Sequence, residues 1–417
     1  MKRVAIIGAG CSGLAAIKSC LEDGFEPVCF ERDDDIGGLW RYSTTSKVGN
    51  GSVYKTCVIN TSKEMMSFSD FPPPQEFPMF MPHRFVLKYF RMYAESFGLI
   101  KYINFKTSVE NIIPATDYGL SGQWRVTYIS GDGESKTEVF DGVLVCTGHH
   151  TYPHIPEFEG LETFTGKYIH SHGYKENVEF TGKRVLVVDG TFLEIDAIIF
   201  ATGFDYKLSF IPESVTRIQN NRTELYKYMF PPHLKNPTIA VIGLVQSIGS
   251  VMPISEMQCR WFMKVMKGEC ELPSEEIMME DIQAKREAME KTYVKSKRHT
   301  LQCFWVEYMD ELADMIGVKP DLWKLFFEDP KLAIRCIFGP CVPAQYRLMG
   351  PGSWNGAKST IKGSVQRCLF PTRTKLLPKN ATGKENQSLY SFSIPRHLHP
   401  YFIILFIVFI FFHLCIV

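Results

Sequence analysis

The first residues with an evident chemical use are a glycine-rich stretch, Gly8-Ala9-Gly10-Cys11-Ser12-Gly13, and an acidic residue further on, Glu31. Glycines at this spacing allow a tight turn, let backbone N–H groups approach a pyrophosphate, and let a helix pack closely on a strand. Glu31 would accept hydrogen bonds from a ribose diol and would repel a 2′-phosphate. The stretch therefore predicts a site for FAD or NAD rather than NADP.

This chemistry requires a strand before the glycines and a helix after them. Val4 to Ile7 is an apolar run, Leu14 to Glu22 has helical apolar spacing, and a second apolar run, Pro27 to Phe30, stops at Glu31. The N-terminus of such a helix presents free N–H groups and the positive end of its dipole to the phosphates. A flexible glycine turn is the alternative, but the order strand, glycine turn, helix, strand and acid favours a dinucleotide site.

Bulk composition narrows the class of protein. A chain of 417 residues suits two domains with extensions. Lys+Arg 46 against Asp+Glu 45 leaves no net field to attract nucleic acid, so we expect no nucleic-acid partner. The twelve cysteines include no C-x-x-C pair, which argues against a zinc ribbon and a redox dithiol and favours reduced thiols in a cytosol-facing protein. We expect neither a metal site nor a secretory leader before the first strand.

Two later apolar runs end in Thr-Gly, Val143 to Gly148 and Ala197 to Phe204. Two such exits are typical of a protein with two dinucleotide-binding lobes, although two unrelated buried strands remain an alternative. Between them Gly182 to Val188 should open a second strand–helix–strand unit, but Asp189-Gly190 follows and the next strand begins almost at once. A parallel crossover needs more residues than this, so we predict a hairpin there and a second lobe without its glycine loop and first helix.

Several further segments have local patterns that predict their secondary structure. Tyr54 to Thr61 is predicted to be a strand, and His83 to Phe97 a helix ended by Gly98. Prolines at 72, 73, 74, 78 and 82 exclude regular structure from Phe71 to Pro82. Gly131-Asp132-Gly133 predicts a hairpin turn, and Pro273 to Lys297 a charged helix.

The loop Gly37-Gly38-Leu39-Trp40 has paired glycines before a bulky apolar pair. It is either pressed against a flat ligand or is a surface turn with Trp40 packed inward.

At the other end of the chain, Tyr401 to Val417 is apolar apart from His413. At ~1.5 Å per residue this run covers roughly 25 Å, enough for a short membrane span or an interfacial helix, with a buried core helix as the alternative. Basic residues just before it place that flank on the cytosolic side.

With these motifs together, the chain resembles the flavin-containing monooxygenases over nearly its whole length. The Gly8–Gly13 turn with Glu31 is similar to the FAD fingerprint of that family, and Gly37 to Trp40 to its flavin-contact loop. The most specific matches are Phe164-x-Gly166-x-x-x-His170-x-x-x-Tyr174 for the identifying motif, Asn60-Thr61-Ser62-Lys63-Glu64-Met65 for the active-site asparagine strand, and Phe200-Ala201-Thr202-Gly203-Phe204 for the second Thr-Gly exit.

The resemblance implies a function. It implies FAD and NADPH as cofactors and oxygenation of soft nitrogen and sulfur nucleophiles, that is amines and sulfides, by oxygen through a hydroperoxyflavin. It places the catalytic amide of Asn60 at the flavin, with Gly38, Leu39, Trp40 and Thr61 also contacting the cofactor. It further implies attachment to the endoplasmic reticulum membrane by the tail, with the body in the cytosol.

The expected fold is α/β: a Rossmann-like FAD-binding domain with a truncated second dinucleotide-binding lobe and a C-terminal hydrophobic tail. We expect an FAD domain at 1–150, a remnant of the NADPH lobe at 151–204, a return to the FAD domain with helices at 205–370, a polar linker at 371–400 and a membrane segment at 401–417. The family's second glycine fingerprint is absent after Val188, which should weaken NADPH binding. A non-catalytic, membrane-attached flavin-binding pseudoenzyme and a disulfide reductase remain as alternatives, the latter lacking its dithiol.

Overall fold

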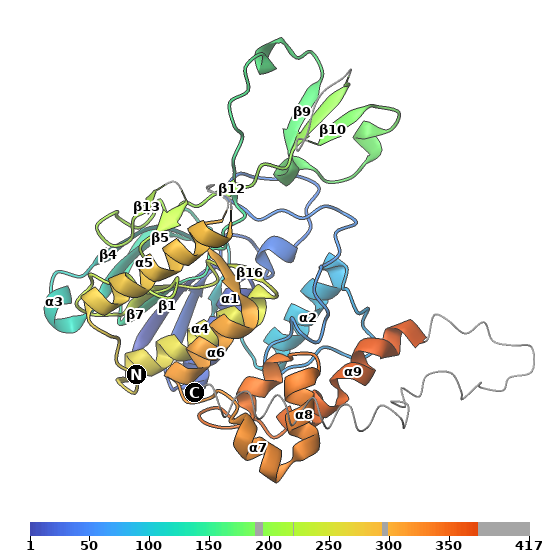
Figure 1. Cartoon of the computed structure of the whole chain (residues 1–417). Helices are drawn as coiled ribbons and strands as arrows, with labels where there is room; N and C mark the ends of the chain where they lie inside the picture. The colour runs from blue at the N-terminus through green and yellow to red at the C-terminus, as the bar shows by residue number, and fades with distance from the viewer. Residues whose placement is uncertain (188–194, 220, 294–298, 374–417) are drawn as a thin grey trace, which may run out of the picture. The chain divides into compact units, whose positions relative to one another are not determined.

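The computed structural model describes residues 1–187, 195–219, 221–293 and 299–373 (Figure 1). The chain divides into two compact units, Met1–Thr372 and Arg373–Val417. The predicted Val188–Asp189 join and the apolar tail at 401–417 lie outside the described residues. Within the described ranges, no helix combines the length and apolarity needed to cross a bilayer.

A five-stranded sheet, in which every neighbouring pair is parallel, forms the body. The order β15-β7-β1-β2-β3 puts β1 in the middle, with later strands added on both sides, which creates a topological switch point at the end of β1. α1 packs on β1 and β2 and against α4. This confirms the predicted Rossmann-like core. Its elements are β1 (Arg3–Ile7), α1 (Cys11–Glu22), β2 (Glu26–Phe30), β3 (Ile103–Asn104), β7 (Gly142–Val145), β15 (Ile239–Val241) and α4 (Val251–Lys267).

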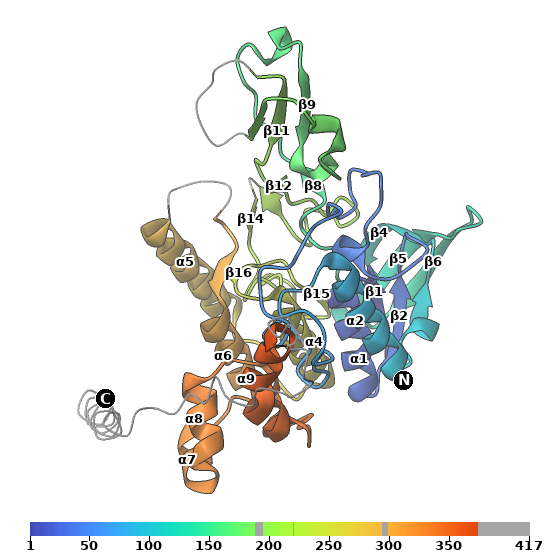
Figure 2. The same ribbon diagram turned by 90° about the vertical axis from the view of Figure 1, so that its right-hand side faces the viewer.

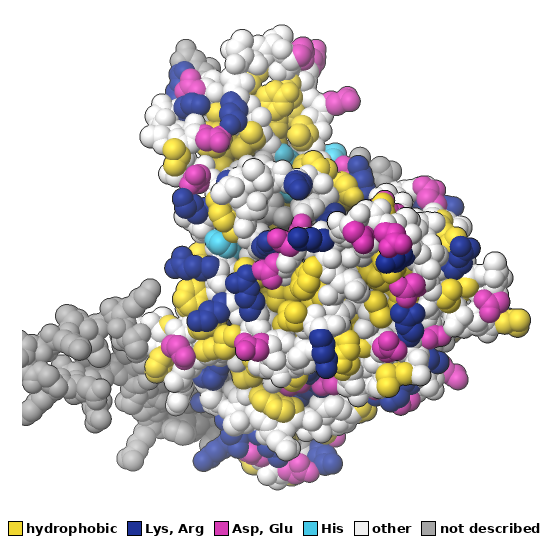
Figure 3. Space-filling model, turned by 180° about the vertical axis from the view of Figure 1, so that it is seen from behind, with side chains coloured by type: hydrophobic (Ala, Val, Ile, Leu, Met, Phe, Trp, Pro, Cys, Tyr) yellow, Lys and Arg dark blue, Asp and Glu magenta, His cyan; other side chains and the backbone are white. Residues whose placement is uncertain are grey.

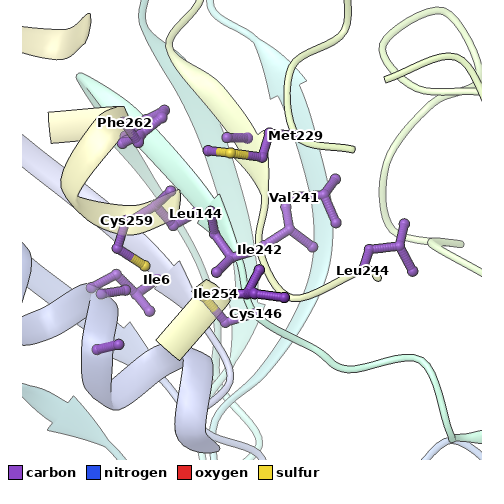
Figure 4. Close-up of a cluster of buried hydrophobic side chains, with 14 of the residues drawn as sticks. Ile6, Leu144, Cys146, Met229, Val241, Ile242, Leu244, Ile254, Cys259 and Phe262 are labelled. Carbon is purple, nitrogen blue, oxygen red and sulfur yellow. The ribbon is translucent and has the colours of Figure 1, made fainter. Parts of the chain in front are cut away.

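The apolar runs of the sequence become the buried strands of this sheet. Val4 to Ile7 are almost wholly buried, as expected for a strand covered on both faces. Side chains from β1, β7, β15 and α4 meet in one core, where Ile6, Leu144, Val241 and Phe262 lie together (Figure 4). The core joins residues 1–146 to residues 206–346, and none of its members comes from the described part of 151–204.

Three more of the predicted elements are confirmed. The helix expected from His83 is α2 (His83–Ser96), and the turn around Asp132 joins antiparallel strands β5 and β6. With β4 these strands form a separate antiparallel sheet. The charged helix expected after Pro273 is α5, whose Ser274 side chain accepts a hydrogen bond from the Ile277 N–H. The elements are β4 (Ser108–Pro114), α3 (Tyr118–Ser121), β5 (Trp124–Ile129), β6 (Ser135–Phe140) and α5 (Glu275–Thr292).

A second, smaller sheet has the order β10-β11-β9 (Figure 1). The predicted hairpin is wrong, because β10 pairs with β11 in parallel, with Val185 opposite Ala197. The side chain of Asp196 accepts hydrogen bonds from the backbone N–H of Arg184 (2.8 Å) and its Nε (3.2 Å). These bonds hold the starts of the two strands side by side, which requires them to run in the same direction. The strands are β9 (Lys167–His170), β10 (Val185–Val187) and β11 (Ala197–Phe200).

The strand predicted from Tyr54 to Thr61 is also wrong. Only a single bridge forms, between Val58 and Pro82. The backbone N–H of Ile59 donates to Met81 O (2.9 Å), but the facing segment contains Pro78 and Pro82, which have no N–H to extend a ladder. Phe71 to Pro82 is irregular, as predicted.

The remaining described elements connect the sheets or follow them. β8 pairs antiparallel with β12 directly after the two Thr-Gly exits, as expected if each exit leads between body and second lobe. α7 and α8 pack together and share a small apolar core with α9 (Figure 2). Their bounds are β8 (Tyr152–Pro153), β12 (Phe204–Asp205), β13 (Ile218–Gln219), β14 (Arg222–Thr223), β16 (Gln246–Ile248), β17 (Gln302–Phe304), α6 (Trp305–Met315), α7 (Leu322–Glu328), α8 (Pro330–Phe338) and α9 (Ala357–Arg373).

A buried charge network ties these parts together. The Arg347 guanidinium, 2% exposed, donates from Nη2 to Glu256 Oε1 (2.9 Å) and from Nε to Ser69 Oγ (2.7 Å). Lys18 of α1 pairs with Asp70 Oδ2 (2.6 Å). Burial and the nearby Glu256 carboxylate raise the pKa of Asp70. Burial alone would also raise the pKa of Glu256. The positive charges of Arg347 and Lys18 outweigh burial, so the pKa of Glu256 is lowered.

Removing Arg347 should therefore destabilise the fold strongly. Arg347→Met leaves the carboxylates of Glu22, Asp70 and Glu256 without their central cation, which we expect to lower the free energy of unfolding by about 3–5 kcal/mol in urea denaturation. Lys319→Met, which removes an exposed pair with Asp314, should cost less than about 1 kcal/mol. An equal, small loss in both variants would contradict the importance of the network.

Candidate functional site

The predicted glycine turn lies at the carboxyl end of β1, where the sheet order reverses. Gly8 has φ +101°, and a Cβ there would lie 2.8 Å from Cys146 O at the end of β7. A Cβ on Gly13 would lie 1.9 Å from Gly8 O. Only glycine fits either position, so α1 begins closely packed on β1, as the sequence predicted.

The N-terminus of α1 opens at Gly10, which has no side-chain cap. The N–H groups of Cys11, Ser12 and Gly13 belong to the first turn and have no acceptor inside the helix. Gly10 itself has an ordinary φ of −76°, and a Cβ there would lie no closer than 3.7 Å to Gly38 Cα. The packing of the protein would therefore accept a small side chain at Gly10. A ligand approaching the turn explains glycine there better than the fold does.

Glu31 follows β2 and is 7% exposed. Its Oε2 accepts a hydrogen bond from the Ala9 N–H (2.7 Å) and its Oε1 accepts one from the Asp33 N–H (2.9 Å). Burial raises the pKa of Glu31, while the two N–H donors oppose that rise. Because an ionised carboxylate has about four lone-pair sites, Glu31 can bind the glycine turn and still accept from ribose hydroxyls.

The loop at Gly37 packs on the same turn. The Gly37 N–H donates to Ala9 O (3.1 Å), and a Cβ on Gly38 would lie 3.2 Å from Gly10 Cα. Gly38, Leu39 and Trp40 form a short 3-10 helix, with Leu39 and Trp40 half-buried and Trp40 packed against the core. Trp40 thus packs inward, as the second alternative predicted, and the loop lies against the glycine turn, while its contact with a flat ligand stays a prediction.

The remaining predicted site residues are Asn60 and Thr61. The Asn60 side chain is exposed, and it has no hydrogen-bond partner among the described residues. In the same ranges no hydrogen bond joins Asn60 or Thr61 to the glycine turn. The structure therefore brings Gly8–Gly13, Glu31 and Gly38 into direct contact, with Leu39 and Trp40 in the same short helix as Gly38, and among the described residues no hydrogen bond adds Asn60 or Thr61 to this cluster.

Sequence reasoning missed a polar layer behind the turn. Ser12 Oγ donates to Ser255 Oγ of α4 (2.9 Å), and the Gly243 N–H donates to Gln258 Oε1 (2.8 Å). The run Ile239 to Gly243 ends in glycine as the first strand does, and this was the available signal. The partners in α4 carried no signal in the local sequence.

His149 and His150 were also missed. They follow β7 at the carboxyl edge of the sheet, with ring centroids 4.2 Å apart. Desolvation, with a contribution from His150, lowers the pKa of His149 to about 3, so its ring is neutral near pH 7. Their position directly after Thr147-Gly148 was the signal that could have identified them.

The motif residue His170 has a positioning role. It is 6% exposed, its Nδ1 accepts from the His172 N–H (3.1 Å), and its Nε2 bonds to Gly203 O (2.9 Å). Since Nδ1 accepts, Nε2 carries the proton and donates to Gly203. His172 Nε2 in turn bonds to Asn50 O (2.8 Å). The motif thus joins the second sheet to its neighbouring segments.

The second lobe differs from the first in its helices. In the described part of 151–204 the only helical elements are three short 3-10 turns, at Leu161–Thr163, Ser171–Gly173 and Val178–Phe180. No α-helix N-terminus comparable with that of α1 occurs in those described residues. Across the described ranges the cysteines are unpaired and no three His, Cys, Asp or Glu side chains converge as a metal ion would require.

Comparison with known proteins places this geometry in a family. A family model described as flavin-binding monooxygenase-like matches residues 1–191 and 189–411. The chain belongs to the flavin-binding monooxygenase family. Flavin-containing monooxygenase 5 of Rattus norvegicus is 40% identical over 509 residues, covering 92% of this chain and 95% of the relative. Dimethylaniline monooxygenase [N-oxide-forming] 2 of Mus musculus is 38% identical over 503 residues, covering 90% of this chain and 94% of that protein.

Solved structures agree on the fold of this flavin-binding monooxygenase. The S-allyl-L-cysteine S-oxygenase of Allium sativum matches with a TM-score of 0.71 at 24% identity, covering 89% of this chain and 99% of that one. Tmm from a Pelagibacter species matches with a TM-score of 0.63 at 23% identity, covering 84% and 94%. At these identities the likeness concerns the fold.

Two substitutions separate ligand binding from folding. Gly10→Ala should fold with a near-native unfolding midpoint, because the added Cβ makes only ordinary contacts, yet it should lose FAD at least tenfold in affinity. Gly13→Ala should fail to fold or unfold much more easily, because its Cβ would overlap Gly8 O. Circular dichroism and titration of the protein with FAD measure both. Full FAD affinity in Gly10→Ala would contradict the site.

Proposed function

We propose that this chain is a FAD-dependent monooxygenase that oxygenates soft nitrogen and sulfur nucleophiles, with small amines or sulfides and oxygen as substrates. The observation that carries the proposal is the β1–α1 turn with Glu31 in a member of the flavin-binding monooxygenase family. FAD, when bound, supplies the oxygen-activation chemistry. The relatives' names, an N-oxide-forming monooxygenase and an S-oxygenase, support heteroatom substrates.

We propose roles for the residues at the glycine turn from their geometry, and for Asn60 and Thr61 from the family resemblance. The N–H groups of Gly10 to Gly13 bind the pyrophosphate at the helix N-terminus, and Glu31 accepts from the ribose. The short 3-10 helix of Gly38, Leu39 and Trp40 lies beside the turn and would cover the cofactor, and Thr61 would also contact it, as the family resemblance implies. The Asn60 amide, which is exposed and without a protein partner, donates its N–H to the reacting atoms. Figure 3 shows Lys and Arg side chains lying among Asp and Glu on one face, which suits neutral small substrates better than nucleic acid.

We infer further that the NADPH site is incomplete. The family match runs in two parts that meet at residues 189–191, and the alignment with the rat relative, 509 residues, is longer than the 417-residue chain. Both observations support a segment missing after Val188. The lack of an α-helix in the described part of 151–204 supports the same inference, since the pyrophosphate of NADPH would have no helix end to bind.

The two cofactor sites suggest a division of the chain into domains. We propose that residues 1–150 and 205–370 form the FAD-binding body and that 151–204 are the remnant of the NADPH lobe. The shared core of residues 1–146 and 206–346, to which the described part of 151–204 adds no residue, supports this division.

We also propose a linker at 371–400 and a membrane segment at 401–417 in the endoplasmic reticulum membrane, with the body facing the cytosol. The exposed side chains of Trp323 (54%), Phe327 (80%) and Phe338 (68%) support a lipid-facing region on α7 and α8.

A single-turnover experiment tests the function without depending on NADPH. The FAD-loaded chain is reduced anaerobically with dithionite, freed of excess reductant, and mixed with oxygen and an aryl methyl sulfide. We expect up to one sulfoxide per flavin, because two electrons and one oxygen molecule yield sulfoxide and water. Hydrogen peroxide without sulfoxide would contradict the monooxygenase function and support the flavin-binding pseudoenzyme.

A separate anaerobic experiment follows reduction of the bound flavin by NADPH. The flavin should be reduced slowly, and rapid reduction at micromolar NADPH would contradict an incomplete NADPH site.

Membrane attachment is tested by flotation with phospholipid vesicles. The full chain should float with the vesicles in high salt, and a variant carrying Ile404→Asp and Val408→Asp should remain in the aqueous fraction, because each charge is costly in hydrocarbon. Asn380→Asp, outside the apolar run, is the control and should float. Wild-type chain left in the aqueous fraction would contradict attachment.

A further inference from the structure

The segment that follows Asn60 is fixed by charges buried in the protein. We define residues 62–73 as the asparagine-flanking loop. Lys63 and Glu64 in this loop are 0% and 1% exposed and pair directly, Nζ to Oε1 at 2.6 Å. Two charged side chains this deeply buried are retained only where they are paired, so the start of the loop has one well-defined position.

One arginine of α9 donates hydrogen bonds to both ends of the asparagine-flanking loop. Arg367 donates from Nε to Glu64 Oε2 (3.1 Å) near the start of the loop. The same guanidinium donates from Nη2 to Pro73 O at its end. Arg367 lies about three hundred positions further along the chain than the loop it holds, so this contact is a feature of the tertiary fold. It joins a C-terminal helix to the segment that carries Asn60.

The middle of the loop has a second anchor. Both the N–H and the Oγ of Ser69 donate to Glu256 of α4, each at 2.7 Å. Asp70 pairs with Lys18 of α1, the helix whose first turn is the predicted phosphate site. The loop is therefore attached to the two helices that support the glycine turn, although no direct hydrogen bond joins Asn60 to that turn in the described residues.

Asn60 itself has backbone support but no side-chain support. The Ile59 N–H donates to Met81 O (2.9 Å) and the Lys63 N–H donates to Met79 O (2.8 Å), so the chain is held on both sides of Asn60. Its amide makes no hydrogen bond within the described residues. Its position must then come from the anchors of its neighbours in the chain.

We propose that Arg367 is a positioning residue for Asn60. Its hydrogen bonds to Glu64 and Pro73 fix the asparagine-flanking loop, and the fixed loop holds the Asn60 amide at the flavin. This inference rests on the proposed function, in which Asn60 faces the reacting atoms. It assigns to the C-terminal helix α9 a part in the active site.

The test compares Arg367→Met with Arg367→Lys and with a matched control. Arg367→Met should fold, since the Lys63–Glu64 pair stays balanced without it. Lys362→Met removes another ion pair from the same helix, with Asp329 at 2.6 Å, and does not touch the loop. Hydrogen exchange of residues 59–69, the visible spectrum of bound FAD and the single-turnover sulfoxide yield are measured for each variant.

We expect Arg367→Met to exchange at least tenfold faster over residues 59–69 and to change the FAD spectrum as Asn60→Ala does. Its sulfoxide yield should fall at least fivefold, and the double variant with Asn60→Ala should fall no further than Asn60→Ala alone. Arg367→Lys should restore most of the exchange protection, and Lys362→Met should match the wild type.

Native exchange in Arg367→Met, or additive losses in the double variant, would overturn the inference. A wild-type sulfoxide yield in Asn60→Ala would instead overturn the role proposed for Asn60. The exchange measurement would still decide, by itself, whether Arg367 fixes the loop. The two failures are thus distinguishable.

Discussion

The close approach of α1 to β1 is the constraint on which the rest of the structure depends. Gly13 leaves no side chain between the helix and Gly8 O, where a Cβ would be only 1.9 Å away. This approach aims the first turn of α1 outward from the sheet edge. Glu31 then reaches the turn from β2 through the Ala9 N–H, and the Gly37 loop reaches it through Ala9 O. The contacts that we propose for Gly10 to Gly13, Glu31 and Gly38 with the dinucleotide follow from that one packing distance.

Buried charge extends the same constraint to distant parts of the chain. Lys18 lies on the helix that begins at the glycine turn, and it pairs with Asp70 in the loop after Asn60. Arg347 and Glu256 complete the connection to α4 and to the C-terminal region. Such a network is costly to break because each charge would be left desolvated and unpaired. It gives the protein a rigid link between the phosphate end of the site and the region of Asn60.

The elements that sequence reasoning predicted well are those set by local pattern. The glycine turn, α1, α2 and the β5–β6 hairpin each follow from residues that lie next to one another in the chain. The two failures came from partners outside the pattern. Arg184 and Asp196 align β10 and β11 in parallel, and the prolines of the facing segment stop a ladder beside Tyr54 to Thr61. Arg347 and Arg367 could not be assigned, because their partners lie about three hundred positions away in sequence.

Hydrogen exchange of the glycine turn, with and without FAD, tests the central claim most directly. The Gly8 N–H already donates to Phe30 O and the Ala9 N–H to Glu31, so both serve as internal references that FAD should leave nearly unchanged. The N–H groups of Cys11, Ser12 and Gly13 have no helical acceptor and should exchange at least tenfold more slowly once FAD binds. Bound FAD with unaltered exchange at these three positions would contradict a pyrophosphate at the start of α1.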